Sequence, residues 1–167
     1  MFAGCAASQP MPTVDFVDLE RFMGDWYVLA NIPTGIEEGA HNAVESYRLA
    51  GDGKIETTFT FREGGFDGER KTYNPTGYVR DEQTNAEWGM QFFWPFKADY
   101  RIVHLDEDYQ VTIIGREKRD YVWVMARDPR IEPEKYEALL DRVAELGYDR
   151  SKVQRVPQRW PEPQGER

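Results

Sequence analysis

The stretch "FMGDWYVLANIP", residues Phe22 to Pro33, contains the pattern that decides the fold. A glycine-led turn is followed by Trp26 and Tyr27 and then by an apolar run of strand length. An indole is a large group to place where a strand begins. The position of Trp26 therefore raises the question of what this indole packs against.

Length and charge exclude several classes of protein. At 167 residues the chain has the size of one domain, and it carries a net charge of -9 with a pI near 4.8. Nucleic-acid binding needs a basic stripe, so we expect no nucleic-acid partner. Anionic membrane surfaces should repel the chain for the same reason. No run of residues approaches the ~20 apolar positions that span a bilayer.

Strand signals recur at roughly ten-residue intervals through the chain, which is typical of a sandwich or barrel. Glycine-rich or acidic turns such as "AGDGK" and "DEQTN" separate them and indicate antiparallel hairpins. Eight such strands, joined up-and-down, can close on themselves and leave no open edge. The expected strands are Asp25–Asn31, Val44–Leu49, Lys54–Arg62, Lys71–Arg80, Glu87–Phe93, Asp99–Leu105, Tyr109–Gly115 and Tyr121–Arg127.

Alternation of apolar residues indicates which side chains share a face of each strand. In "KIETTFTFR" the residues Ile55, Phe59 and Phe61 lie on one face. In "YVWVMAR" both faces are apolar, which predicts that another element packs outside this strand. The stretch "EPEKYEALLDRVAELG" supplies it, because its apolar residues form one stripe at helical spacing. The short "KVQRV" that follows could add a ninth strand.

The predicted fold class is therefore all-β. It is an eight-stranded antiparallel up-and-down β-barrel with one C-terminal α-helix packed outside. We expect the barrel domain to cover residues 14–157, with a tether at 1–13 and a flexible tail at 158–167.

With this order of elements the chain resembles the lipocalin family, specifically the bacterial outer-membrane lipocalins related to apolipoprotein D. The resemblance is carried by "GDWY" from Gly24, by the turn Asp106–Tyr109, by "RDYVWVMARDP" at Arg119–Pro129 and by "QFFWPFKADY" at Gln91–Tyr100. The turn departs from the family pattern, which often has Thr-Asp-Tyr. The resemblance implies a structural motif of Gly24, Trp26 and Arg127. In it the guanidinium lies across the indole and hydrogen-bonds to backbone carbonyls.

The resemblance also implies that the open end of the barrel holds a small hydrophobic ligand. An eight-stranded barrel is about wide enough for one. A fatty acid or lysophospholipid is the expected ligand, and an extended polyene is an alternative ligand. By parity with Trp26 and Arg127, the expected ligand-binding residues are Val28, Ala30, Phe59, Met90, Phe92, Tyr100, Ile102, Tyr121, Trp123 and Met125, and Tyr78 joins them through its hydroxyl at the rim. Of these, the three tyrosines could position a carboxylate or ester at the rim. Each aromatic residue could instead merely fill the barrel.

The first residues, "MFAGCAASQPMP", resemble a bacterial lipobox with a tether behind it. This predicts lipidation of Cys5 and anchoring at the periplasmic face of a bacterial outer membrane. The charged n-region and the apolar h-region of a signal peptide are missing from the pattern. The alternative is an ordinary small-residue N-terminus with a free thiol.

Catalysis has little support in the sequence. The chain contains no GxSxG, HExxH or CxxC pattern, and its two histidines, His41 and His104, are far apart. His104 shares the inward parity of Tyr100 and is expected to be a satisfied core histidine. We therefore predict no enzyme activity, no metal and no cofactor. Two alternatives stay open: a barrel enzyme acting on a lipid or polyene as isomerase or hydrolase, and a filled-barrel scaffold. A homodimer is possible.

Overall fold

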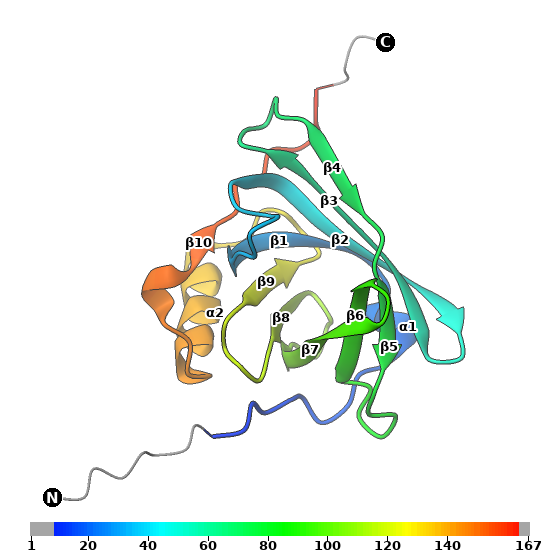
Figure 1. Cartoon of the computed structure of the whole chain (residues 1–167). Helices are drawn as coiled ribbons and strands as arrows, with labels where there is room; N and C mark the ends of the chain where they lie inside the picture. Colours follow the sequence, from blue (N-terminus) through cyan, green and yellow to red (C-terminus); the bar gives the residue numbers. More distant parts are fainter. Residues whose placement is uncertain (1–8, 164–167) are drawn as a thin grey trace, which may run out of the picture.

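Nine strands follow one another around a closed barrel in the computed structural model, which describes residues 9–163 (Figure 1). Neighbouring strands are antiparallel, and β1 pairs with β9 to close the wall. The strands are β1 (Gly24–Ile32), β2 (Ala40–Gly51), β3 (Lys54–Glu63), β4 (Arg70–Tyr73), β5 (Thr76–Val79), β6 (Glu87–Phe93), β7 (Phe96–Leu105), β8 (Val111–Gly115) and β9 (Val122–Ala126). Because β4 and β5 are halves of one predicted strand, the prediction of an eight-stranded antiparallel barrel is confirmed.

The expected strand Lys71–Arg80 is interrupted at Asn74 and Pro75. Proline has no N–H to donate to a sheet ladder, so the strand breaks there. The Pro75 carbonyl still accepts a hydrogen bond from the Thr57 N–H at 3.1 Å. Beyond the break β4 pairs with β3, whereas β5 pairs with both β3 and β6. We call the end of the barrel formed by the β3–β4 and β6–β7 loops the open end. Within the described residues, no hydrogen-bonded ladder joins β4 to β6 toward this end.

A bulge in β1 reverses the direction of the side chains that follow it. Val28 pairs with Met125, but Ala30 pairs with Val124, so Leu29 is an extra residue on the β1 side. Ala30 therefore faces outward and belongs to the outer apolar cluster. The prediction that Ala30 faces the barrel interior is wrong for this reason.

A similar irregularity occurs in β7. Ile102 pairs with Ile114, and His104 pairs with Ile113, which leaves Val103 as the extra residue. Ile114 belongs to the inner cluster and Ile113 to the outer one. His104 consequently faces outward. Partial burial, and then the charge of Arg142, lower the pKa of its imidazole there. The predicted inward parity of His104 is wrong.

Helix α2 (Pro133–Glu145) covers the outer face of β9, as the two-sided apolar pattern of that strand predicts (Figure 1). Its buried residues Tyr136, Leu139, Leu140 and Val143 pack in one cluster with Val122, Val124 and Ala126 of β9. The predicted strand after the helix is β10 (Gln154–Arg155). It pairs with β1 at Ala30 and Asn31, beyond the last β1–β2 pair at Tyr27 and Val44. A short 3-10 turn, η1 (Arg150–Lys152), connects α2 to β10.

Both ends of the described chain contact the barrel. Before β1 the short helix α1 (Leu19–Phe22), which the sequence pattern does not predict, begins at Asp18, whose carboxylate accepts from two backbone N–H groups. We expected a flexible tail from residue 158. Instead the Gln158 amide donates to the Val28 carbonyl at 2.7 Å, and Glu162 pairs with Arg62 at 2.7 Å. The predicted lipidation site, Cys5, lies outside the described residues.

Candidate ligand-binding site

Trp26 closes the base of the barrel beneath Arg127, as expected. The guanidinium carbon lies 3.8 Å from the centre of the indole ring. The guanidinium also donates to the carbonyls of Asp25 at 2.9 Å, Arg21 at 2.9 Å and Met23 at 2.8 Å. Trp26 is fully buried, and its indole N–H donates to the Phe22 carbonyl at 2.9 Å. The arginine thus joins β9 to the segment that leads into β1.

Aromatic side chains fill the lower half of the barrel above this base. Phe22 packs against both Trp26 and Trp88, with ring centres 5.1 and 5.7 Å apart. Trp88 stacks on Tyr100 at 4.7 Å and 7° between planes. This part of the interior is solid, and any ligand must lie above it.

A cavity occupies the upper half of the barrel. The empty space between its walls is about 450 Å³, including the open mouth. The cavity is therefore a narrow cup, better matched to one alkyl chain than to a bulky ring system. Its walls are Glu45, Tyr47, Pro75, Met90, Phe92, Ala98, Asp99, Tyr100, Ile114, Arg116, Trp123 and Met125.

Polar groups converge at the floor of this cavity. The Tyr47 and Tyr100 hydroxyls are hydrogen-bonded at 2.7 Å. Glu45 lies beside them on β2, directly across from Trp26 on β1 and Phe59 on β3, and so faces inward. Burial, and then the charge of Glu37, raise the pKa of Glu45 to about 8. The floor is thus polar, whereas most of the wall above it is apolar.

Glu37 fastens the loop between β1 and β2 to the cavity wall. Its carboxylate accepts hydrogen bonds from the indole N–H of Trp123 at 2.9 Å and from the Thr34 backbone N–H at 3.1 Å. The Asn31 amide donates to the same oxygen at 3.4 Å. Burial raises the pKa of Glu37 to about 7 in spite of these donors. A wall residue of the cavity therefore holds the loop that borders it.

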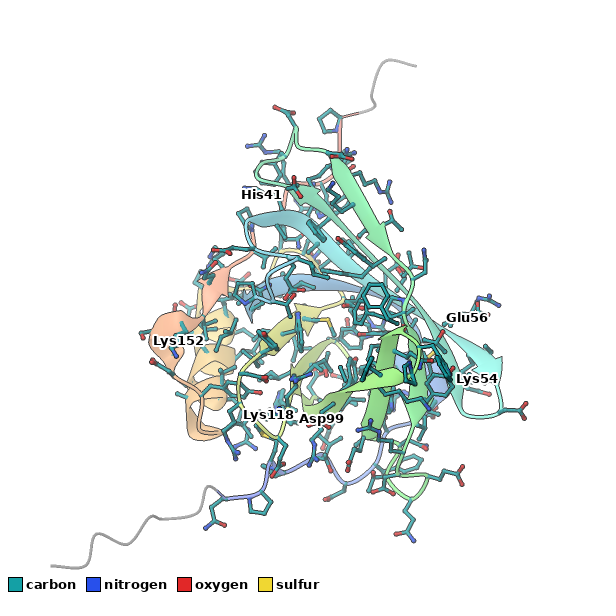
Figure 2. The ribbon with its side chains drawn as sticks, in the orientation of Figure 1. His41, Lys54, Glu56, Asp99, Lys118 and Lys152 are labelled. Atoms are coloured by element: carbon teal, nitrogen blue, oxygen red, sulfur yellow. The ribbon has the colours of Figure 1, made fainter. Side chains whose placement is uncertain are left out.

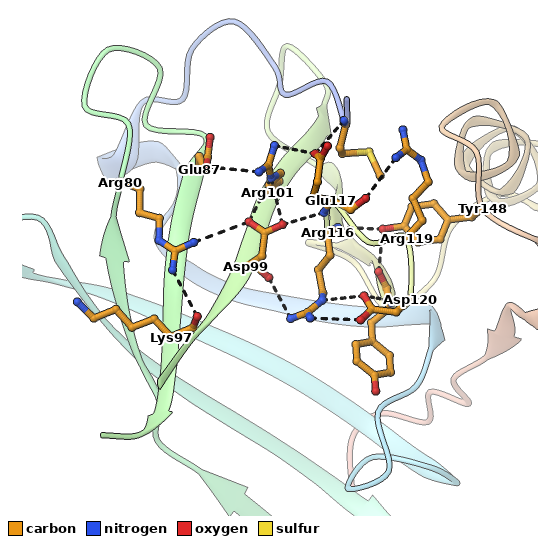
Figure 3. Close-up of polar contacts among 12 residues, drawn as sticks. Arg80, Glu87, Lys97, Asp99, Arg101, Arg116, Glu117, Arg119, Asp120 and Tyr148 are labelled. Atoms are coloured by element: carbon orange, nitrogen blue, oxygen red, sulfur yellow. Dashed lines mark hydrogen bonds and ion pairs between the residues drawn. The ribbon is translucent and has the colours of Figure 1, made fainter. Parts of the chain in front are cut away.

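Charged residues on the β7 side of the mouth form closed ion pairs (Figure 3). Arg116 pairs with Asp120 at 2.8 Å and lies over the Tyr121 ring. Asp99 accepts from the Arg101 guanidinium at 3.1 Å and from the Glu117 backbone N–H at 2.7 Å. Arg116 is the basic residue of the cavity wall, and Asp120 balances its charge.

Next to the mouth, the β6–β7 hairpin exposes a group of aromatic rings. The exposed fractions are 78% for Phe93, 86% for Trp94 and 78% for Phe96. Phe92, at 42%, joins this group to the cavity wall. Such a concentration of exposed aromatic rings on one hairpin marks an interaction surface.

Comparison with known proteins identifies the family. A family model described as a lipocalin-like domain matches residues 17–158. The chain belongs to the lipocalin-like family. It is 31% identical to temperature-induced lipocalin-1 of Arabidopsis thaliana over 159 residues, which cover 89% of this chain and 83% of the relative. It is 28% identical to outer membrane lipoprotein Blc of Escherichia coli (strain K12), with 90% and 88% covered.

Solved structures agree on the lipocalin fold. Insecticyanin from the tobacco hornworm Manduca sexta superposes with a TM-score of 0.69 at 15% identity, covering 90% of this chain and 85% of that one. At this level of identity the likeness shows the fold alone. The resemblance inferred from the sequence is confirmed by the family model and the relatives together.

Five of the eleven expected ligand-binding residues line the lipocalin cavity: Met90, Phe92, Tyr100, Trp123 and Met125. Val28, Phe59 and Ile102 point inward but are packed within the solid part of the core. Tyr121 lies beside Trp123, with ring centres 6.3 Å apart. Tyr78, like Ala30, points outward, because its neighbour Gly77 is the residue that pairs with the inward-facing Ile55 and Met90. Lys97 covers the outward Tyr78 ring at 3.9 Å.

Sequence reasoning missed the polar floor of the lipocalin cavity. Glu45 and Tyr47 lie in "NAVESYRLA", where charged and apolar residues mix on both faces and no clear alternation appears. Only the cross-strand partners Phe59 and Thr57, both buried, show that these two residues face inward. Glu37 gave no signal either, because it lies in a loop.

No arrangement typical of a metal site or a catalytic histidine occurs in the described part of the chain. Residues 9–163 contain no group of three or more His, Cys, Asp or Glu side chains placed to hold a metal ion. His41 lies well away from Asp99 of the cavity wall (Figure 2). No helix in the same range is both long and apolar enough to cross a bilayer.

Proposed function

We propose that this lipocalin binds a single-chain amphiphile, of the class that includes fatty acids and lysophospholipids, in the upper half of its barrel. One observation carries the proposal: an apolar, aromatic-walled cup opens at the mouth, above a polar floor. A cavity with a few convergent polar groups is the usual form of a small-molecule site. The bound ligand would be stored or transported and not converted, since we assign no residue a catalytic role.

Affinity should come mainly from burial of the alkyl chain. Each methylene contributes about 0.8 kcal/mol, so about twelve carbons supply about 10 kcal/mol before the cost of association is subtracted. A micromolar or weaker dissociation constant is the expected result.

Filling the cavity tests this proposal. The Ala98→Trp substitution places an indole in the cavity wall opposite Met90, and should weaken dodecanol binding at least about tenfold in isothermal titration calorimetry. Ala50→Trp, at an exposed position of the β2–β3 hairpin, is the matched control and should bind like the wild type. Equal binding by both variants, or no binding by the wild type, would support the filled-barrel scaffold instead.

We also propose that the protein works at the bacterial outer membrane, on the periplasmic side, through a lipid on Cys5. The lipobox-like sequence around Cys5 supports this, as does the similarity to relatives named outer membrane lipoprotein Blc. The aromatic hairpin adds independent support, because its exposed rings lie next to the mouth from which an amphiphile would enter.

A further inference from the structure

The floor of the cavity carries a carboxyl group that lacks a compensating cation. Glu45 faces the cavity between Trp26 and Phe59. No lysine, arginine or histidine among residues 9–163 forms an ion pair with it. Buried ionisable groups are normally paired with an opposite charge. The Glu45 carboxyl has no such partner within the part of the chain that the structure describes and is therefore available to a ligand.

The groups around Glu45 reinforce its preference for positive charge. The second enclosed carboxylate, Glu37, lies close enough for its charge to raise the pKa of Glu45. The Tyr47 and Tyr100 rings border the same space, and the Trp123 ring forms the wall near Glu37. Aromatic faces attract cations, most strongly where water is excluded.

The cavity offers no corresponding site for an anion. Arg116 is the one basic residue in its wall among the described residues. Its Nε and Nη2 donate to the Asp120 carboxylate at 2.8 and 3.2 Å, and its Nη1 donates to the Asp99 carbonyl at 3.4 Å. Asp99 in the same wall is paired with Arg101. The charges left unbalanced inside the cup are therefore negative.

From this arrangement we infer that the cavity selects amphiphiles with a cationic head, such as an alkylammonium, over those with a carboxylate head. The head lies at the floor against Glu45 and the two tyrosines, and the chain extends along Met90 and Met125 toward Phe92. The inference rests on the proposed function: it keeps the single-chain amphiphile as the ligand and ranks a cationic head above the carboxylate head of a fatty acid.

Binding of such a ligand is coupled to loss of a proton. With its pKa raised to about 8, Glu45 is mostly protonated at neutral pH. An alkylammonium that binds beside it favours the carboxylate, so the O–H bond of Glu45 breaks and the proton passes to solvent. Affinity should then rise about tenfold per pH unit below pH 8 and level off above it. Glu37 adds to the rise, because its pKa is about 7, whereas Tyr47 and Tyr100, with pKa values well above the usual 10, stay protonated.

Three probes of equal chain length test the inference: dodecylammonium, dodecanol and dodecanoate. They are titrated into the full chain by calorimetry below their micelle concentrations, at about pH 6, 7 and 8. At pH 8 dodecylammonium should bind at least about tenfold more tightly than dodecanoate, with dodecanol between them. Equal or tighter binding of dodecanoate, or an ammonium affinity that does not change with pH, would overturn the inference without any variant being needed.

The Glu45→Gln variant identifies the residue responsible. It should lose most of the preference for dodecylammonium and most of its pH dependence while still binding dodecanol. Glu56→Gln is the matched control, because Glu56 is exposed on the outside of β3 and pairs with Arg48 there (Figure 2). It should behave like the wild type. A preference that survives Glu45→Gln would overturn the assignment.

The same titrations separate this inference from the proposed function. Dodecanol binding with no preference between the charged probes leaves the function standing and removes the inference. If none of the three probes binds, both are wrong. The fold of Glu45→Gln is checked by thermal unfolding. Since a raised native pKa makes the wild type lose stability as pH rises from about 4.5 to about 8, the variant should be the more stable protein at pH 8.

Discussion

At the scale of single residues, Arg127 and Gly24 hold the base of the barrel. The Arg127 guanidinium donates hydrogen bonds to the carbonyl oxygens of Arg21, Phe22, Met23 and Asp25, and it lies on the indole ring. Gly24 has a φ of 95°, and a Cβ there would lie 3.3 Å from the arginine. Glycine is required because it adopts this backbone conformation and leaves room for the guanidinium.

Removing the guanidinium should destabilise the fold and leave the cavity intact. Arg127→Met leaves several carbonyls of the base without their donor and should lower the free energy of unfolding by about 3 kcal/mol, measured by urea denaturation. Arg48→Met removes an exposed pair with Glu56 and should cost about 0.5 kcal/mol or less. Equal effects of the two substitutions would refute the structural role of Arg127.

Sequence patterns predict residue roles only where the strand alternation is uninterrupted. Trp123 and Met125 follow the simple period of two and line the cavity as expected. Ala30 and His104 do not, because each follows a bulge that shifts the parity by one residue. The residue types at these two bulges do not reveal them, so the change of parity cannot be predicted from the sequence. Glu45 was missed because a carboxyl at a core-facing position contradicts the apolar pattern used to choose such positions.

At the scale of elements, three features surround the mouth of the cavity. The β1–β2 loop is fastened to Trp123 through Glu37, the break between β4 and β5 places Pro75 in the cavity wall, and the β6–β7 hairpin exposes its aromatic tip. The cavity reaches this side of the barrel, because Pro75 and Phe92 both line it. An amphiphile can therefore enter beside the aromatic rings.

The hairpin should attach the barrel to a lipid surface. The Phe93→Ser/Phe96→Ser double variant should bind zwitterionic phosphatidylcholine vesicles several-fold more weakly than the wild type in a flotation assay, because aromatic rings favour the membrane interface. Neutral vesicles are used since the chain carries a net charge of -9. Phe16→Ser removes an aromatic ring that is 58% exposed in the segment before α1, and should leave binding unchanged.

Two results would contradict this use of the hairpin. One is equal vesicle binding by the double variant and the wild type. The other is a wild type that ignores vesicles but forms a dimer in sedimentation experiments, which the double variant abolishes. In that case the aromatic tip is a contact between copies of the chain.

At the scale of the whole molecule, the barrel divides into a solid lower half and a hollow upper half. The fold class and the outer helix could be predicted because periodicity expresses them directly. The closing motif of Trp26 and Arg127 could be predicted because the sequence resembles the lipocalin family. The depth of the cavity could not. The depth depends on the packing of Phe22 against Trp88 inside the barrel. Phe22 reaches the interior from the short helix α1, which the sequence pattern does not predict.

The position of a bound amphiphile in this half-filled barrel is therefore the decisive observation. The most direct measurement is a crystal structure with dodecanol brominated at its terminal carbon, in which anomalous scattering locates the bromine. We predict the hydroxyl near Glu45 and Tyr100, with the bromine near Phe92 at the mouth. Bromine found only in the groove between α2 and β10, near Tyr136 and Arg155, or no bound ligand at saturating concentration, would contradict the account.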